Sequence, residues 1–198
     1  MSQTERLKWD ERYRTGAYTE RKHPTALLAE WMPKLPRGRA LDVACGAGRN
    51  SIYLAANGWQ VDAVDISPVG LERARQSAAQ RGVEVHWIQA DLEEDPRTVL
   101  PMGPYDLILL ARYVNPAVYP PLVERLACNG ILLCEQHIVS PEDVIGPKNP
   151  AFRLQHNELL RAVAGFDGRV LYYREGVVTD PDGRRAALAQ LILCRECS

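Results

Sequence analysis

The sequence lacks any apolar run near the roughly 20 residues that a transmembrane helix needs. It also lacks an excess of either charge, because 24 lysines and arginines stand against 25 aspartates and glutamates. The polar N-terminus has no apolar core of the kind that a signal peptide carries. We therefore expect a cytoplasmic protein that acts neither on a membrane nor on nucleic acid.

Cysteine is scarce as well. The five cysteines are odd in number and irregularly spaced, which argues against a disulfide framework. Cys194 and Cys197 have C-x-x-C spacing, but neither a second pair nor a histidine cluster accompanies them, and a closed zinc site needs four ligands. We predict no metal site, a fraying strand at the C-terminus, and core positions for Cys128 and Cys134.

The apolar segments that are present predict an α/β domain. Strand-like and helix-like stretches alternate from Arg39 onward, and an Asp180–Gly183 turn joins two final strands into an antiparallel hairpin. This order predicts a doubly wound, mostly parallel, seven-stranded sheet with one antiparallel strand at its end. We expect a single domain over residues 1–198, with a helical lid segment at 1–36 and the core at 37–198. The expected strands are 40–43, 60–64, 84–88, 106–110, 131–135, 169–178 and 186–194, and the expected helices are 50–56, 68–81, 119–128 and 157–164.

The segment from Ala40 to Ser51 gives the first indication of function. It predicts a buried strand that reaches Asp42 and then turns through Gly46 and Gly48 into a helix. Glycine adopts positive φ without strain and has no Cβ, so a ligand can approach its backbone closely. Open α/β sheets bind nucleotide-like ligands at such a turn, although a purely structural turn would have the same pattern.

Acidic residues follow at the ends of the next two strands. Asp65 lies 19 residues after Gly46, near the offset at which a carboxylate accepts hydrogen bonds from ribose hydroxyls. Asp91 and Leu92 follow the third strand, where the carboxylate can accept from an adenine amine and the leucine can cover the ring. Asp91 could instead cap a helix. The end of the fourth strand, at Ala111, faces the same crevice.

In order and spacing these motifs resemble those of class I S-adenosylmethionine-dependent methyltransferases over residues 40–135. The segments 9–18, 112–113 and 146–150 further resemble the branch that includes the tellurite-resistance and thiopurine methyltransferases. The resemblance implies a Rossmann-like fold, S-adenosylmethionine as the cofactor, and an N-terminal helix folded over it. The implied cofactor-binding residues are Asp42, Ala44, Gly46, Gly48, Asn50, Asp65, Ile66, Asp91, Leu92 and Ala111, with the lid residues Trp9, Tyr13 and Tyr18. Packing of these three aromatic residues against the sheet is the alternative.

The rival cofactor is NAD, in an oxidoreductase. A dinucleotide site favours G-x-G-x-x-G, and Ser51 stands in the position of the third glycine. Arg49 and Asn50 would crowd a pyrophosphate and Asp42 would repel it, whereas Asp42 suits the cationic amino group of S-adenosylmethionine. The sequence therefore favours S-adenosylmethionine.

Methyl transfer from a sulfonium is an in-line displacement, for which a protein mainly aligns the acceptor and excludes water. The catalytic candidates are His137, as an ionisable group after the fifth strand, and Arg112, as a holder of an anionic acceptor or of the cofactor carboxylate. A strand-end histidine and a surface ion pair are the alternatives for these two. Arg153 and His156, at the same rim, are weaker candidates.

The acceptor is expected to be a small molecule, such as a thiol or a metalloid oxyanion. Nucleic-acid amino methyltransferases carry an Asn/Asp-Pro-Pro-aromatic motif directly after the fourth strand, where this chain has Ala111-Arg112-Tyr113. Val177 and Val178 stand where tellurite-type members have His-Arg, which disfavours tellurite itself. A non-catalytic S-adenosylmethionine-binding protein of the same fold is the alternative function, and the oligomeric state is not predicted.

Overall fold

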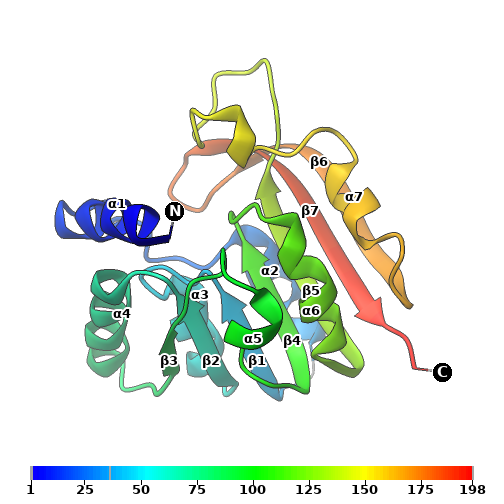
Figure 1. Ribbon diagram of the computed structural model, residues 1–198, viewed down its shortest axis with the longest axis horizontal. Coiled ribbons are helices and arrows are strands. Elements are labelled where there is room, and N and C mark those ends of the chain that lie inside the picture. The colour runs from blue at the N-terminus through cyan, green and yellow to red at the C-terminus, as the bar shows by residue number, and fades with distance from the viewer. Residues whose placement is uncertain (1, 36, 198) are drawn as a thin grey trace.

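The computed structural model describes residues 2–35 and 37–197 of the chain. The described residues form one seven-stranded sheet in the order β3-β2-β1-β4-β5-β7-β6, with helices on both of its faces (Figure 1). The strands are β1 Arg39–Val43, β2 Gln60–Asp65, β3 His86–Gln89, β4 Tyr105–Ala111, β5 Leu126–His137, β6 Gly168–Thr179 and β7 Arg185–Arg195. The α-helices are α1 Ser2–Arg14, α2 Ala26–Trp31, α3 Arg49–Ala56, α4 Pro68–Gln80, α5 Pro96–Val99, α6 Tyr119–Glu124 and α7 Glu158–Val163.

The central strands are apolar on both faces, because each face is covered by helices. In β4, Leu107 and Leu109 join one core cluster while Ile108 and Leu110 join the other. The first cluster also holds leucines of α2, α3 and α4, and the second holds side chains of α6 and α7. This alternation with a period of two residues gives the doubly wound layering that the sequence predicts.

The predicted fold class is confirmed, with one change in strand position. Strands β1 to β5 pair in parallel, and β7 is antiparallel to both of its neighbours. The hairpin prediction is right, since the Asp180 N–H donates to Arg184 O at 2.8 Å and closes the turn. However, β7 lies between β5 and β6, so the antiparallel strand is not at the edge of the sheet.

The prediction of a helix over 119–128 is wrong in its second half. Helix α6 ends at Glu124, and Leu126 already pairs with Tyr105 of β4. Asn129, with φ of 59°, then bends the strand where the sequence indicates the end of a helix. Strand pairing, which depends on a partner far away in the sequence, therefore overrides the local helix signal.

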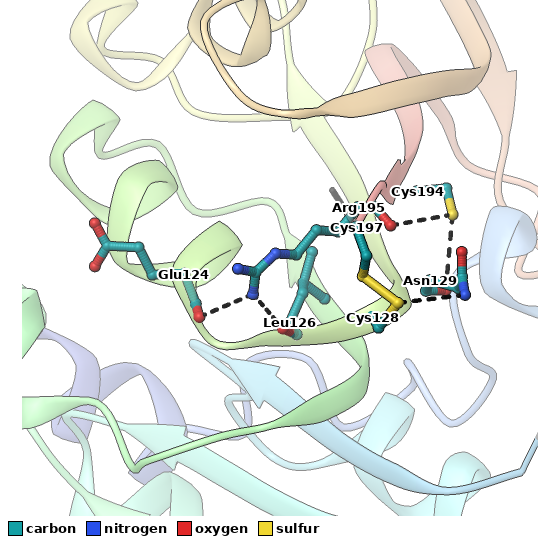
Figure 2. The surroundings of a disulfide bond; sticks show 7 residues. All are labelled: Glu124, Leu126, Cys128, Asn129, Cys194, Arg195 and Cys197. Carbon is teal, nitrogen blue, oxygen red and sulfur yellow. Dashed lines mark hydrogen bonds between the residues drawn. A yellow bond between two sulfur atoms is a disulfide. The ribbon is translucent and has the colours of Figure 1, made fainter.

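The cysteine predictions also need correction. Cys128 is exposed and forms a disulfide with Cys197, which ties the start of β5 to the segment after β7 (Figure 2). Cys134 is buried, as predicted, and the Cys194 thiol lies near the carbonyl oxygen of Asn129 at 3.7 Å. The described residues contain no cluster of ligands suited to a metal ion. Among their helices, none is long and apolar enough to cross a membrane.

Candidate functional site

The site residues gather where the strand order reverses, at the carboxyl ends of β1 and β4. From β1 the sheet continues to β2 on one side and to β4 on the other, which is the topological switch point at which doubly wound folds bind ligands. The turn after β1 takes left-handed φ values at Ala44 (55°), Gly46 (60°) and Gly48 (78°). These values turn the chain sharply from β1 into α3.

Asp65, at the end of β2, fixes this turn. Its Oδ2 accepts a hydrogen bond from the Gly46 N–H at 2.8 Å and its Oδ1 accepts one from the Ser67 N–H at 2.9 Å. The residue is only 7% exposed. A carboxylate has about four acceptor positions, so both oxygens keep capacity for a ribose hydroxyl.

Asp42 lies beneath the same turn and is 1% exposed. The Ser51 hydroxyl donates to its Oδ2 at 2.5 Å, and Oδ1 has no hydrogen-bond partner among the described residues. Burial raises the pKa of Asp42 to about 7. Burial, with the nearby charge of Asp10, raises the pKa of Asp65 to about 6. Both carboxylates are therefore poorly compensated and suited to a cationic ligand.

A cavity of about 530 Å³ opens beside the ends of β2 and β3, a volume within the range typical of small-molecule sites. Ile66 and Asp91 line it, together with Gln3 and Arg6 of α1. Asp91 Oδ1 accepts from the Glu93 N–H at 2.9 Å, which resembles the capping role weighed for it above. Leu92 belongs to the apolar core and does not line this cavity.

Helix α1 is attached to α4 above these strand ends (Figure 1). The Ser67 hydroxyl donates to the buried Asp10 carboxylate at 2.6 Å, and Arg73 donates to the backbone carbonyl of Tyr13 at 3.0 Å. The three aromatic residues named as a lid lie together, with ring centroids 6.1 to 6.3 Å apart in each pair. Tyr13 is the deepest of them: a Cβ added to Gly46 would lie 2.5 Å from its hydroxyl.

Two further predicted cofactor residues, Asn50 and Ala111, make their contacts with the segment that contains α2. The Asn50 carboxamide oxygen accepts the Thr25 N–H at 2.9 Å, so this buried side chain anchors the segment that leads into α2. Ala111 is half-buried at the end of β4 and packs against the cluster that holds the α2 leucines.

Arg112, directly after β4, is part of a buried ionic network. Its side chain is 8% exposed and donates to Glu135 Oε1 and to Asp180 Oδ1, at 3.1 and 2.5 Å. Asp180 and Glu135 are buried, and Gln190 donates to the second oxygen of Glu135 at 2.9 Å. The alternative of a surface ion pair for Arg112 is therefore wrong, because the ion pair is buried. The sequence does not identify Asp180 as a partner of Arg112, because an aspartate at the start of a hairpin turn needs no other explanation.

His137, at the end of β5, is 6% exposed, and its Nδ1 has no partner in the part of the chain that the structure describes. Burial and the positive charges of Arg112, Arg153 and Arg21 lower its pKa to about 3. The ring is therefore neutral at pH 7 and offers a hydrogen bond more readily than it accepts a proton. His156 is exposed and pairs with Glu175 instead.

Comparison with known proteins indicates the class of domain. Residues 40–127 match a family model described as a methyltransferase domain. The ubiquinone biosynthesis O-methyltransferase of Marinobacter nauticus is 30% identical over 116 residues, which are 59% of this chain and 48% of that protein. The chain spans less than half the length of the curated relatives that it matches, which include ribosomal RNA methyltransferases.

Solved structures share the fold. TehB from Haemophilus influenzae superposes with a TM-score of 0.70 at 20% identity, covering 85% of this chain and 61% of TehB. Magnesium protoporphyrin IX methyltransferase from Synechocystis, solved with bound S-adenosylmethionine, gives 0.64 at 20% identity, with 86% and 77% covered.

The chemistry of the site fits this cofactor. S-adenosylmethionine carries a sulfonium and an ammonium group, a ribose and an adenine. The unpartnered Asp42 oxygen, the Asp65 carboxylate and the cavity beside Ile66 offer one counterpart to each kind of group. Residues 40–127 thus match a methyltransferase domain, and they lie in a Rossmann-like sheet of the order β3-β2-β1-β4-β5-β7-β6.

Proposed function

We propose that the protein is an enzyme that transfers the methyl group of S-adenosylmethionine to a small-molecule acceptor. The observation that supports this most is the hydrogen bond from the Gly46 N–H to Asp65, next to the cavity lined by Ile66 and Asp91. In this proposal Asp65 accepts from the ribose hydroxyls, and Asp91 and Ile66 hold the adenine. Asp42, Gly46 and Gly48 face the methionine end, as the sequence suggests.

When bound, the cofactor supplies an electrophilic methyl group on a sulfonium. The protein then has to place the acceptor in line with that methyl group and keep water away. We assign water exclusion to α1 and the Tyr13 ring, which are held over the glycine turn by Arg73 and Asp10. Residues 1–36 act as a lid in this proposal.

The acceptor side of the site lies at the carboxyl ends of β4 and β5. Arg112 and His137 both follow those strands, and both are largely buried. A thiol, a metalloid oxyanion or a molecule of similar size is the acceptor that we propose. The balanced charge of the chain, 24 basic against 25 acidic residues, supports a small molecule over nucleic acid.

Calorimetry with S-adenosylmethionine and its demethylated product tests the cofactor assignment. We expect micromolar affinity for the wild-type protein and at least a tenfold loss of affinity in Asp65→Ala. That change removes both the hydrogen bond to the Gly46 turn and the acceptor for the ribose hydroxyls. Circular dichroism should show that the variant still folds. Wild-type affinity in Asp65→Ala would contradict the ribose assignment.

Transfer of a labelled methyl group separates an enzyme from a binding protein. The panel contains thiols, phenols, selenite, tellurite and a ribosomal RNA transcript. Labelled small-molecule product supports the proposal, and labelled RNA overturns the choice of acceptor. Cofactor binding without transfer to any member would favour the non-catalytic alternative.

A further inference from the structure

Four arginine side chains converge at the carboxyl ends of β4 and β5. Arg112 follows β4, Arg153 precedes α7, Arg49 begins α3, and Arg21 belongs to the segment after α1. The positive charges of Arg112, Arg49 and Arg21 act on one another, and Arg153 is linked to them through His137. The pKa of Arg49 is lowered by burial and by the charges of Arg112 and Arg21, and that of Arg21 is lowered by burial and by Arg112.

The carboxylates that face these arginines are Glu135 and Asp180, which are both paired with Arg112, and Asp42, which lies near Arg49. The guanidinium groups outnumber the carboxylates that face them, which leaves an excess of positive charge. Removing a charged group from water is costly unless it gains a partner of opposite charge. The arginine cluster is therefore suited to a ligand that brings negative charge.

Three buried nitrogens in this cluster lack a partner. Arg112 Nη1, His137 Nδ1 and Arg21 Nε make no hydrogen bond with any described residue, although the side chains of Arg112 and His137 are more than nine-tenths buried. Arg112 is also held in a left-handed backbone conformation, with φ of 62°, and its N–H donates to Glu135 O at 2.6 Å. Strained, over-determined positions of this kind gather at ligand sites.

The segment between β5 and α7 lies against the same groups, at the top of the view in Figure 1. A Cβ added to Gly146 would lie 2.9 Å from His137 Nδ1 and 3.0 Å from the Arg153 guanidinium. Arg153 itself donates to the carbonyl oxygens of Pro147 and Ile138, at 2.8 and 3.0 Å. The backbone thus holds Arg153 in place beside His137 before any ligand arrives.

Arg49 directly follows Gly48 of the glycine turn, so it is the arginine that we assign to the carboxylate of the cofactor, which leaves Arg112 and Arg21 for another anion. We propose that the methyl acceptor is a small anion whose carboxylate or oxyanion group binds between Arg112 Nη1, His137 Nδ1 and Arg21. This inference rests on the proposed function and narrows its acceptor. Asp180 Oδ2, also without a partner among the described residues, adds an acceptor for a hydroxyl or thiol on the same molecule.

The first test measures anion binding without turnover. The protein, saturated with S-adenosylhomocysteine, is titrated with inorganic phosphate and separately with acetate, so that oxyanion and carboxylate are compared. We expect saturable binding of at least one of them and about a tenfold weaker affinity in Arg21→Gln, because one charged donor is lost. Arg12→Gln is the matched control. The Arg21 guanidinium lies over the Tyr18 ring, 5.1 Å from its centroid, and the Arg12 guanidinium lies over the Trp9 ring at 4.7 Å.

The second test compares acceptors that differ in one charge. Thioglycolate is paired with 2-mercaptoethanol, and 4-hydroxybenzoate with phenol. The anionic member of at least one pair should be methylated with a kcat/KM at least tenfold higher, and Arg21→Gln should raise KM for that member alone. Phosphate should compete with the acceptor and leave the affinity for S-adenosylmethionine unchanged.

The two proposals fail in different ways. If the wild-type protein did not bind S-adenosylhomocysteine at all, the proposed function would be contradicted. Normal S-adenosylhomocysteine binding without phosphate or acetate binding would overturn the anion site alone, as would equal methylation of charged and neutral acceptors. Equal affinity for the anions in Arg21→Gln and Arg12→Gln would also overturn it.

Discussion

Arg112 and Asp180, 68 residues apart in the sequence, form an ion pair of 2.5 Å in which both side chains are more than nine-tenths buried. The pair connects the end of β4 to the turn between β6 and β7. It thereby ties the parallel part of the sheet to its C-terminal hairpin.

We predict that Asp180→Asn lowers the free energy of unfolding by about 3 kcal/mol, because breaking a buried ion pair leaves an uncompensated charge. Glu135 remains as a partner for Arg112 and keeps the loss toward the lower end of the usual range. Urea denaturation at pH 7 measures the change. Asp182→Asn, in the same turn, is the control: its side chain contacts only the partly exposed Arg184, so the change should cost under about 1 kcal/mol. Equal losses in the two variants would show that the ion pair contributes nothing beyond the turn.

The contact between Gly46 and Tyr13 gives a second prediction. Gly46→Ala places a Cβ 2.5 Å from the Tyr13 hydroxyl and puts alanine at φ of 60°, which costs about 1 kcal/mol by itself. Tyr13→Phe removes the clash, since the next ring atom lies at 3.6 Å. We expect the double variant to regain stability and cofactor affinity that Gly46→Ala alone loses.

Gly82→Ala is the matched control for that experiment. Its φ of 65° imposes the same backbone strain, but a Cβ there meets no atom within 4 Å. Calorimetry and urea denaturation on the wild type, Gly46→Ala, the double variant and Gly82→Ala separate the cost of backbone strain from the cost of the clash with Tyr13. If Gly46→Ala lost no more than Gly82→Ala, Tyr13 would not be packed against the glycine turn.

The two buried aspartates predict the pH dependence of stability in the absence of cofactor. Asp42 and Asp65 have pKa values of about 7 and about 6, raised first by burial. Between pH 4 and pH 7 the folded protein binds more protons at these groups than the unfolded chain does. Stability from this source is therefore highest below pH 4 and falls as pH rises through these pKa values.

Asp42→Asn tests this sign. Asparagine keeps an oxygen for the Ser51 hydroxyl but carries no charge, so we expect it to stabilise the cofactor-free protein by a few kcal/mol at pH 8 and hardly at all at pH 4. Denaturation at both pH values measures the difference. A variant that is less stable than wild type at pH 8 would contradict the uncompensated charge of Asp42.

The same pKa values predict proton release on cofactor binding. A cationic ligand favours the charged carboxylates and lowers their pKa, so the affinity for S-adenosylmethionine should rise from pH 5 to pH 8. Calorimetry at pH 6.5 in two buffers of different ionisation enthalpy measures the released protons. Net proton uptake would show that neither Asp42 nor Asp65 meets the positive charge of the cofactor.

The sequence allowed the fold class to be predicted because the information is local. Alternating apolar residues such as Leu107 and Ile108 assign the two faces of a strand, and the strand–turn–helix at Asp42 to Ser51 identifies the cofactor class. Contacts between distant segments carry no such signal. The ion pair of Asp180, the anchoring of Thr25 by Asn50 and the burial of Leu92 all depend on tertiary packing.

Cys128 and Cys197 show the same limit, because spacing alone does not reveal that residues 69 positions apart meet in space. Their disulfide lies at the start of β5 (Figure 2). His137 is the last residue of that strand. In the chain-entropy account, a cross-link that closes a loop of this length stabilises a protein by about 4 kcal/mol at most.

We therefore predict that Cys128→Ser and Cys197→Ser each lower the free energy of unfolding by an equal amount within that limit, and that neither changes cofactor affinity. Denaturation with and without a reductant measures this, with Cys134→Ala as a control whose cavity cost should not depend on the reductant. Because both single variants remove the same cross-link, the double variant should lose no more stability than either, and additive losses would mean that the two sulfurs act separately.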